Sequence, residues 1–151
     1  MKKTMKAAVV PAFGQPPALQ HAPAPPPGRA EVLVRVAACR VCHTDMHAAD
    51  GDWPVKPALP FIPGHEGVGT VAALGPDSAS LRVGDRVGVP WLYSACGTCD
   101  YCITGWETLC PEQKNTGYGV NGGFADYVLC DPNYVGHLPD GIEFGPAAPV
   151  L

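Results

Sequence analysis

The sequence predicts a mainly β domain with short helices, and three observations lead to this fold class. Short apolar runs recur at close spacing, and Gly, Pro, Asn and Asp fill the gaps between them, as expected of strands joined by turns. The 18 glycines and 18 prolines are scattered without forming a repeat, which is typical of a turn-rich domain. With 151 residues the chain is long enough for one domain with a real core. We therefore expect one domain over residues 1–151.

The expected elements follow the apolar runs in order along the chain. The proline-rich stretch HAPAPPPGR, residues 21–29, predicts a stiff extended connector after the first strand. Short helices are expected at His43–Ala49 and from Gly145 onward. The expected strands cover residues 5–10, 31–38, 67–74, 85–92, 124–131 and 133–139.

Composition and charge exclude several classes of partner. A net charge of -4, with only 16% charged residues, offers no basic surface for nucleic acid or acidic lipid. The N-terminal MKKTMKAAVVPAF imitates a signal peptide, but Lys6 and Pro11 limit its apolar run to four residues. No apolar stretch approaches the length of a membrane span. We expect a cytoplasmic protein without nucleic-acid or membrane partners.

Four of the seven cysteines form the most specific pattern in the chain, C-x2-C-x2-C-x7-C. In a cytoplasmic protein such cysteines are expected to bind metal, because thiols there stay reduced. The short gaps let successive thiolates turn toward one ion, and the longer gap lets the chain return with the fourth. A structural zinc in a lobe at about residues 91–115 is predicted, and an iron–sulfur cluster is the competing interpretation. The four residues are Cys96, Cys99, Cys102 and Cys110.

The run GYGVNG, Gly117–Gly122, matches the glycine spacing of a dinucleotide-binding turn. That motif requires a strand before it and a helix after it. Here Gly123 and an alternating strand pattern follow instead, and Asn121-Gly122 indicates a hairpin turn. We therefore do not predict a dinucleotide site at this run.

A second group of possible metal ligands is spread over two segments, CRVCHTDMH at residues 39–47 and PGHEGVG at residues 63–69. Cys42 and His65 could supply two ligands of a catalytic zinc site, although each residue taken alone is more often a buried thiol or a core histidine than a ligand. Asp45 could accept a hydrogen bond from the far ring nitrogen of His65 and fix its tautomer, or it could serve as a helix-start residue, and the two roles are compatible. The neighbouring polar residues are Thr44, Asp45, His47 and Glu66.

Several long motifs together resemble the catalytic domain of zinc-dependent medium-chain alcohol dehydrogenases. They are the segment VCHTDMHAADGDWPVKPALPFIPGHEGVG, then VGDRVGVPWL, the four-cysteine stretch and GYGVNGGFADYV. The resemblance spans nearly the whole chain and is closest to the yeast and bacterial type that oxidises small primary alcohols such as ethanol. It implies a GroES-like, largely antiparallel partial barrel with short helices and a protruding structural-zinc lobe.

The resemblance also implies roles for individual residues. Cys42 and His65 match ligands of the catalytic zinc, and Glu66 matches an acidic neighbour that can approach the metal. Zinc lowers the pKa of a bound alcohol, so that hydride can leave near neutral pH. Thr44 matches the hydroxyl that begins a proton relay, and His47 matches the histidine that passes the proton to solvent.

Cofactor and substrate contacts are implied in the same way. His43 falls where the family presents a basic residue to the cofactor pyrophosphate, and Thr44 and His47 are expected beside the cofactor as well. Trp53 and Trp91 match aromatic walls that narrow the pocket toward small alcohols. Ordinary core packing is the competing interpretation of these two tryptophans.

Some positions depart from the family pattern or lie outside its roles. Arg40 stands where the family often has Gly, so either the backbone there is less free or Arg40 points to solvent. Cys39 is expected to be a packing thiol at a strand end, which argues against a redox dithiol with Cys42, and Cys130 is expected to be equally inert. In the family, the motif at Leu151 continues into a third zinc-ligating cysteine and then a Rossmann domain.

Two functions are consistent with the sequence. The first is the catalytic domain of an NAD-dependent alcohol dehydrogenase, in which zinc assists reversible hydride transfer from a small alcohol to NAD and gives an aldehyde. The alternative is a zinc-binding domain without independent activity, which we expect for these 151 residues alone because catalysis needs a nicotinamide beside the zinc. Full-length members of the family are homo-oligomers, largely through the cofactor domain.

Overall fold

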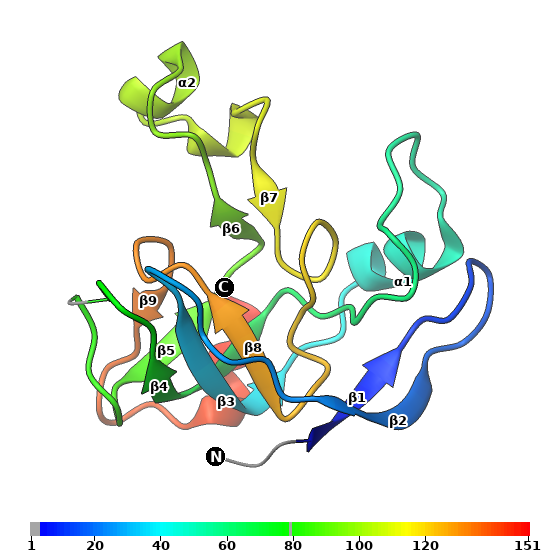
Figure 1. Ribbon diagram of the computed structural model, residues 1–151, viewed down its shortest axis with the longest axis horizontal. Coiled ribbons are helices and arrows are strands. Elements are labelled where there is room, and N and C mark those ends of the chain that lie inside the picture. The colour runs from blue at the N-terminus through cyan, green and yellow to red at the C-terminus, as the bar shows by residue number, and fades with distance from the viewer. Residues whose placement is uncertain (1–3, 79) are drawn as a thin grey trace.

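The computed structural model describes residues 4–78 and 80–151 and is mainly β, as predicted. Its framework is an antiparallel five-stranded sheet with the order β8-β3-β4-β5-β9, visible in the lower part of Figure 1. The strands are β3 (Val32–Cys39), β4 (Gly67–Leu74), β5 (Arg86–Val89), β8 (Tyr127–Cys130) and β9 (Gly136–His137).

The two central strands are apolar on both faces, so the sheet is buried on both sides at its middle. Val32, Leu33 and Val34 are successive residues of β3, and all three are fully buried. Burying side chains of this size contributes about 1.5–3 kcal/mol each. The largest core cluster lies on this sheet and comprises Val32, Val34, Val71, Leu81, Val87, Val89, Val128 and Cys130.

A two-stranded ribbon of β1 (Thr4–Val9) and β2 (Ala18–Pro23) lies beside the sheet. The prediction of an extended connector over residues 21–29 is wrong for its first three residues, which belong to β2. Pro23 is the last residue of β2, where a residue without an N–H does not interrupt the ladder. The residues before it therefore pair with β1. Met5 and Val9 of the ribbon pack against Ile62 in a second core cluster.

Helix α1 (His43–Asp50) confirms the predicted helix and carries part of the candidate site. It begins after Cys42, whose N–H donates to Asp45 Oδ2 at 2.9 Å. It ends at Gly51, which has a left-handed φ of 72° that suits glycine. Ala48 and Ala49 pack the helix against Val10 and Phe61, and these four residues form a third buried cluster.

The C-terminal helical turn is also present, as α3 (Phe144–Ala147) followed by the 3-10 turn η2 (Ala148–Val150). Ala147 and Ala148 pack on Val68 of β4. None of the helices in the described part of the chain has the length and apolarity needed to cross a membrane.

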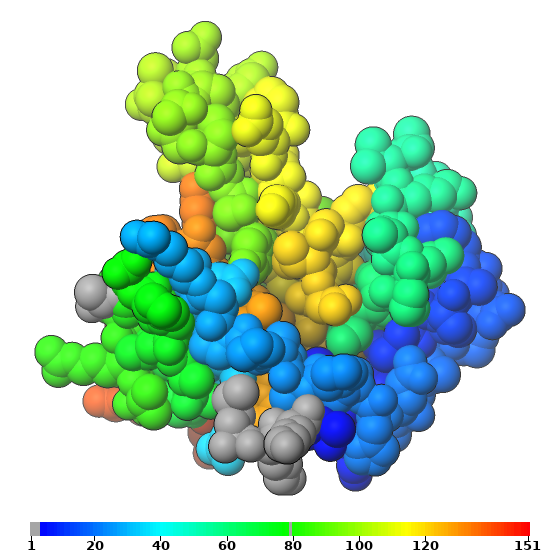
Figure 2. Space-filling model, viewed as in Figure 1, coloured from blue at the N-terminus to red at the C-terminus, as the bar shows by residue number. Residues whose placement is uncertain are grey.

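A lobe projects from the sheet on a stem of β6 (Leu92–Ser94) and β7 (Lys114–Asn115), as Figures 1 and 2 show. Between these strands lie α2 (Asp100–Ile103) and the 3-10 helix η1 (Glu107–Leu109). Only two residues between positions 96 and 110 are buried, and both are cysteines. The lobe therefore lacks an apolar core of its own.

Three expected strands are shorter than predicted, for local reasons. The expected strand at 85–92 breaks at Pro90 into β5 and β6. The expected strand at 124–131 begins at Tyr127, because the residues before it bond to β1 instead: Ala8 N–H donates to the Phe124 carbonyl at 2.8 Å. The last expected strand is reduced to β9, whose two residues pair with β5.

The glycines of the GYGVNG run serve backbone packing. The expected hairpin turn at Asn121-Gly122 is wrong, because the turn occupies residues 117–119. Gly122 N–H instead donates to the Ile62 carbonyl at 2.7 Å. A Cβ on Gly122 would stand 2.2 Å from the carbonyl oxygen of Gly64. These glycines thus let two backbone segments touch, and no helix follows them before β8.

Substituting Gly64 tests this close approach. Gly64 has a φ of +100°, and a Cβ there would lie 2.7 Å from the backbone nitrogen of Phe124. Gly64→Ala should lower the free energy of unfolding by about 3 kcal/mol through strain and backbone displacement. Chemical denaturation measures this loss. Gly136→Ala is the matched control, since its Cβ meets nothing within 4 Å; equal losses in the two variants would contradict the argument.

Candidate active site and metal centres

The four cysteines of the lobe converge on one point. Their sulfur atoms lie within 4.8 Å of one another. Cys102 Sγ is 3.8 Å from Cys96 Sγ and 3.5 Å from Cys99 Sγ. A tetrahedral ion with zinc–sulfur bonds of about 2.3 Å has sulfur–sulfur edges of about 3.8 Å. The spacing therefore fits a single tetrahedral ion, and it is too tight for a multi-iron cluster between the thiolates.

Local hydrogen bonds prepare this cluster for a cation. The N–H groups of Thr98 and Cys99 and the Thr98 hydroxyl lower the pKa of Cys96 to about 6. Burial, together with contacts to neighbouring thiols, raises the pKa of Cys102 to about 12. Four crowded thiolates repel one another without a cation, and a bound cation reverses that balance. The donor set is thus suited to a divalent metal.

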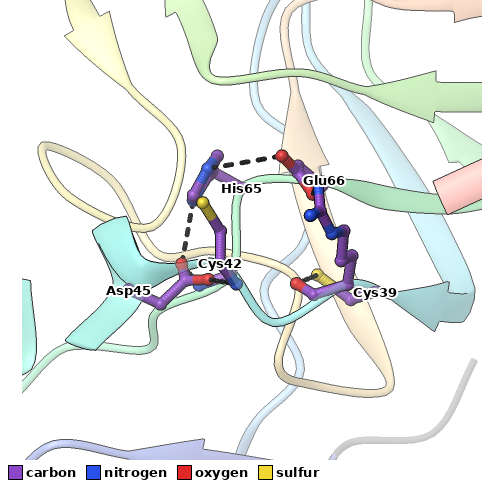
Figure 3. A network of polar contacts seen from close by, with 7 residues as sticks. Cys39, Cys42, Asp45, His65 and Glu66 are labelled. Carbon is purple, nitrogen blue, oxygen red and sulfur yellow. Dashed lines mark hydrogen bonds and ion pairs between the residues drawn. The ribbon is translucent and has the colours of Figure 1, made fainter. Parts of the chain in front are cut away.

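A second cluster brings together Cys42, His65 and Glu66, whose donor atoms also lie within 4.8 Å of one another. Cys42 stands immediately before α1, whereas His65 and Glu66 immediately precede β4. His65 and Glu66 are 6% and 8% exposed. Figure 3 shows the Cys42 sulfur and the His65 ring directed toward one another, with the Glu66 carboxylate beside the ring.

Asp45 connects the two segments that carry this cluster. It is 4% exposed. Its Oδ2 accepts the Cys42 N–H at 2.9 Å, and its Oδ1 accepts the Gly64 N–H at 3.0 Å. Oδ1 also lies 2.9 Å from His65 Nδ1 (Figure 3), which is the hydrogen bond expected from the sequence. With the proton on Nδ1, the lone pair of His65 Nε2 is free for a metal.

The pKa values of the two strongest donors follow from these contacts. The Thr44 backbone N–H and hydroxyl lower the pKa of Cys42, against the effect of burial. Burial alone would lower the pKa of His65, but the hydrogen bond and negative charge of Asp45 outweigh it and raise the pKa. Cys42 is therefore favoured as a thiolate, which is the form that binds metal.

The remaining polar residues of the predicted relay lie along α1. Thr44 is half-buried next to Cys42, while His43 is exposed. The ring centroids of His43 and His47 are 5.0 Å apart. Nδ1 of His47 lies 2.7 Å from Asp52 Oδ2, a partner that was not predicted. The sequence does not predict this pair, because residues five apart across a helix end do not have the three- or four-residue spacing of neighbours on a helix face.

Aromatic side chains form one wall beside the second cluster. The Trp91 ring stands edge-on to the His65 ring, with the ring centroids 5.1 Å apart. The ring centroids of Trp53 and Trp91 are 6.4 Å apart. Tyr118 contacts both tryptophans, at 5.3 and 5.8 Å, and its hydroxyl donates to the Val55 carbonyl. Tyr118 was missed in the sequence, because its approach depends on the glycine packing of the loop around it.

The other two cysteines lie outside both clusters. Cys39 ends β3, and burial raises its pKa to about 12. Its thiol donates to the Arg40 carbonyl oxygen at 3.7 Å, a contact drawn as a dashed line in Figure 3. Cys130 is 2% exposed within the main core cluster, and burial raises its pKa as well. The geometry gives neither thiol a role beside the metal donors.

Arg40 does not simply point to solvent. Its backbone N–H donates to the Glu66 carbonyl at 3.1 Å, and its guanidinium Nη1 lies 3.3 Å from Glu66 Oε2. The side chain of Arg40 is 50% exposed, whereas that of Glu66 is 10% exposed. The position that departs from the family pattern thus contacts one of the possible metal donors.

Comparisons with known proteins agree with this arrangement. Residues 28–140 match the family model described as the alcohol dehydrogenase GroES-like domain. An alcohol dehydrogenase of Rhizobium meliloti (strain 1021) is 62% identical over 148 residues, which are 98% of this chain and 44% of that protein. The chain thus spans less than half the length of this relative.

Solved structures give the same result. A short chain alcohol dehydrogenase from E. coli CFT073, complexed with the cofactor NADH, matches with a TM-score of 0.87 at 27% identity. The match covers 97% of this chain and 42% of the E. coli chain. A cobalt and zinc bound thermostable alcohol dehydrogenase from Pyrobaculum aerophilum matches with a TM-score of 0.86 at 31% identity. This match covers 96% of this chain and 44% of the P. aerophilum chain. The chain belongs to the alcohol dehydrogenase GroES-like domain family.

Proposed function

We propose that residues 1–151 form the catalytic domain of a zinc-dependent alcohol dehydrogenase that transfers hydride reversibly between a small primary alcohol and NAD. The observation that carries the proposal is the convergence of Cys42, His65 and Glu66, fixed by Asp45, beside an aromatic wall. The P. aerophilum neighbour with bound zinc and cobalt supports a metal here, and the E. coli neighbour with NADH supports a nicotinamide cofactor.

The donor sets suit two different zinc sites. In the lobe, Cys96, Cys99, Cys102 and Cys110 would hold a structural ion with a closed shell. At the second cluster, Cys42 and His65 would hold the ion, with Glu66 as the acidic neighbour. A zinc ion there supplies Lewis-acid chemistry that favours loss of the alcohol proton, and NAD supplies the hydride acceptor.

The chain's own residues provide a route for the alcohol proton. The Thr44 hydroxyl, next to Cys42, is placed to accept it first. His47 lies one helical turn further along α1 and is partly exposed, so its ring can pass a proton to solvent. The carboxylate of Asp52 holds Nδ1 of His47 at 2.7 Å, which leaves Nε2 to exchange the proton. His43, exposed beside His47, is proposed to face the cofactor pyrophosphate.

The aromatic side chains support a small substrate. Trp53, Trp91 and Tyr118 stand around the approach to His65 and present apolar surface there. We propose that they keep water from the reacting carbon and restrict the substrate to a short alkyl group. A small alcohol or its aldehyde is therefore the proposed substrate. We also propose that the complete protein is cytoplasmic and forms a homo-oligomer, as expected for its family.

A metal-binding domain without turnover of its own is the second candidate function. It is favoured by the glycine run 117–122, which packs on Gly64 rather than opening a helix for a cofactor. In the described part of the chain, the element that follows this run is the strand β8 and not a helix. The run therefore lacks the strand-turn-helix arrangement of a dinucleotide site.

An activity assay tests the proposed function. The full-length protein, supplied with zinc, NAD and ethanol, should form NADH, whereas residues 1–151 alone are expected to form none. In the full-length protein, Cys42→Ser should abolish turnover because a metal donor is weakened. Cys39→Ala is the matched control from the same C-x-x-C pair and should keep the activity. Full metal loading without any NADH formation would favour the second candidate function.

Removing one aromatic wall should change the substrate range. Trp53→Ala is expected to raise kcat/KM for bulkier primary alcohols relative to ethanol by about tenfold, the scale of a modest change in pocket volume. Steady-state kinetics over an alcohol series measures the ratio. Trp106→Ala, on the exposed surface of the lobe, should leave it unchanged. An unaltered ratio in Trp53→Ala would assign Trp53 to packing alone.

Metal removal from the lobe should loosen it. Because the lobe buries only cysteines between positions 96 and 110, strong chelation should expose residues 91–115 to proteases. Limited proteolysis followed by mass spectrometry locates the cleavage sites. Cys99→Ser should reproduce the effect without chelator. Cleavage that stays the same in both cases would mean that the lobe holds its shape without an ion.

A further inference from the structure

Arg40 and Glu66 face each other across the end of the ladder between β3 and β4. The last register pair of that ladder is Cys39 with Gly67, and the bond from Arg40 N–H to the Glu66 carbonyl extends it by one step. The backbone thus fixes the two residues opposite one another. Their side chains meet as a consequence, with Nη1 of Arg40 at 3.3 Å from Oε2 of Glu66.

The two oxygens of Glu66 have different surroundings. Oε1 lies 3.9 Å from Nε2 of His65, which is the ring nitrogen left free by Asp45. Oε2 accepts from Arg40, and within residues 4–78 and 80–151 this is the only side-chain hydrogen bond recorded for the carboxylate. Since the Glu66 side chain is 10% exposed, water has little access to replace it.

We propose that Arg40 is a positioning residue that occupies Oε2 of Glu66 and so leaves a single carboxylate oxygen directed at the cation site. This inference rests on the metal site proposed at Cys42 and His65. Asp45 orients the ring of His65 in the same indirect way, by holding the atom that does not face the metal. Each of the two buried donors thus has a partner that holds the atom turned away from the metal: Asp45 holds His65, and Arg40 holds Glu66.

The Arg40–Glu66 pair is not an ordinary surface ion pair. Exposed ion pairs contribute about 0–1 kcal/mol to stability. Arg29 and Asp77 form such a pair at 2.8 Å, with side chains 85% and 60% exposed, far from the cluster in sequence. The Arg40 pair differs because its acidic partner is buried beside metal donors, where an orientation has chemical consequences.

Loss of the guanidinium should change how the site binds a cation. Without Arg40, the Glu66 carboxylate can rotate and present both oxygens to the ion. Its negative charge is also no longer compensated, so it attracts a divalent cation more strongly. An ion at this site would then be held by one more oxygen. Arg40 thus limits Glu66 to a single oxygen at the cation site.

The test uses Co²⁺ alone as the probe. Mild chelation empties the Cys42 site, metal analysis confirms that the four-cysteine site keeps its zinc, and Co²⁺ is then titrated in. In Arg40→Met the visible d–d bands should weaken, because their intensity falls as a tetrahedral ion gains ligands. Competition with a chelator should show Co²⁺ bound about tenfold more tightly, the lower end of effects from outer partners.

Matched variants separate positioning from folding. Arg40→Lys keeps the charge and should stay near the unaltered protein, and Arg29→Met removes a distant ion pair and should change nothing. In a Glu66→Gln background, Arg40→Met should have no further effect, because the partner is already lost. Arg40→Gln serves if the Met variant does not fold by circular dichroism.

Three results would overturn the inference: bands and affinity in Arg40→Met equal to those of the unaltered protein, weaker Co²⁺ binding in that variant, or the same change in the Glu66→Gln background. A protein that takes up no Co²⁺ at the Cys42 site would remove the proposed metal site itself. Co²⁺ that binds with the same bands and affinity in Arg40→Met as in the unaltered protein would remove only the positioning role.

Discussion

The arrangement of the candidate site depends on the buried carboxylate of Asp45. Its two oxygens accept from Cys42 N–H and Gly64 N–H and hold the ring of His65, so one side chain closes the start of α1, the turn before β4 and the imidazole. A buried carboxylate is tolerated only when it is fully hydrogen-bonded, and these partners meet that condition. The donors on α1 and on the segment before β4 keep their separation because both are tied to Asp45.

The sequence predicted the parts of the molecule that depend on local chemistry. The four-cysteine spacing, the helix that starts after Cys42 and the central strands each follow from neighbouring residues. The parts it missed depend on tertiary contacts. Asp52 was missed because it lies beyond the end of α1. β2 was missed because prolines precede it and Pro23 ends it, and because its partner is the ribbon strand β1. Tyr118 comes near Trp91 only through backbone packing between distant glycines.

The two cysteine-containing centres obtain their geometry by different means. In the lobe, the four thiols come from one short stretch whose own turns and N–H groups direct the sulfurs. At the second cluster, the donors come from separate segments, and outer partners such as Asp45 and Arg40 direct them. The first arrangement suits an ion that replaces an apolar core. The second suits an ion whose surroundings must remain partly open.

The glycine contacts around Gly64 also limit how this scaffold can diversify. The loop that carries Tyr118 is held by Gly122 against the segment that carries His65, so an insertion there would displace His65 together with the aromatic wall. Trp53 lies in an irregular, largely exposed segment after α1, where added residues can be accommodated at the surface. Under the proposed function, new substrate preferences are therefore expected to evolve by changes in length around Trp53 and by single substitutions around Tyr118.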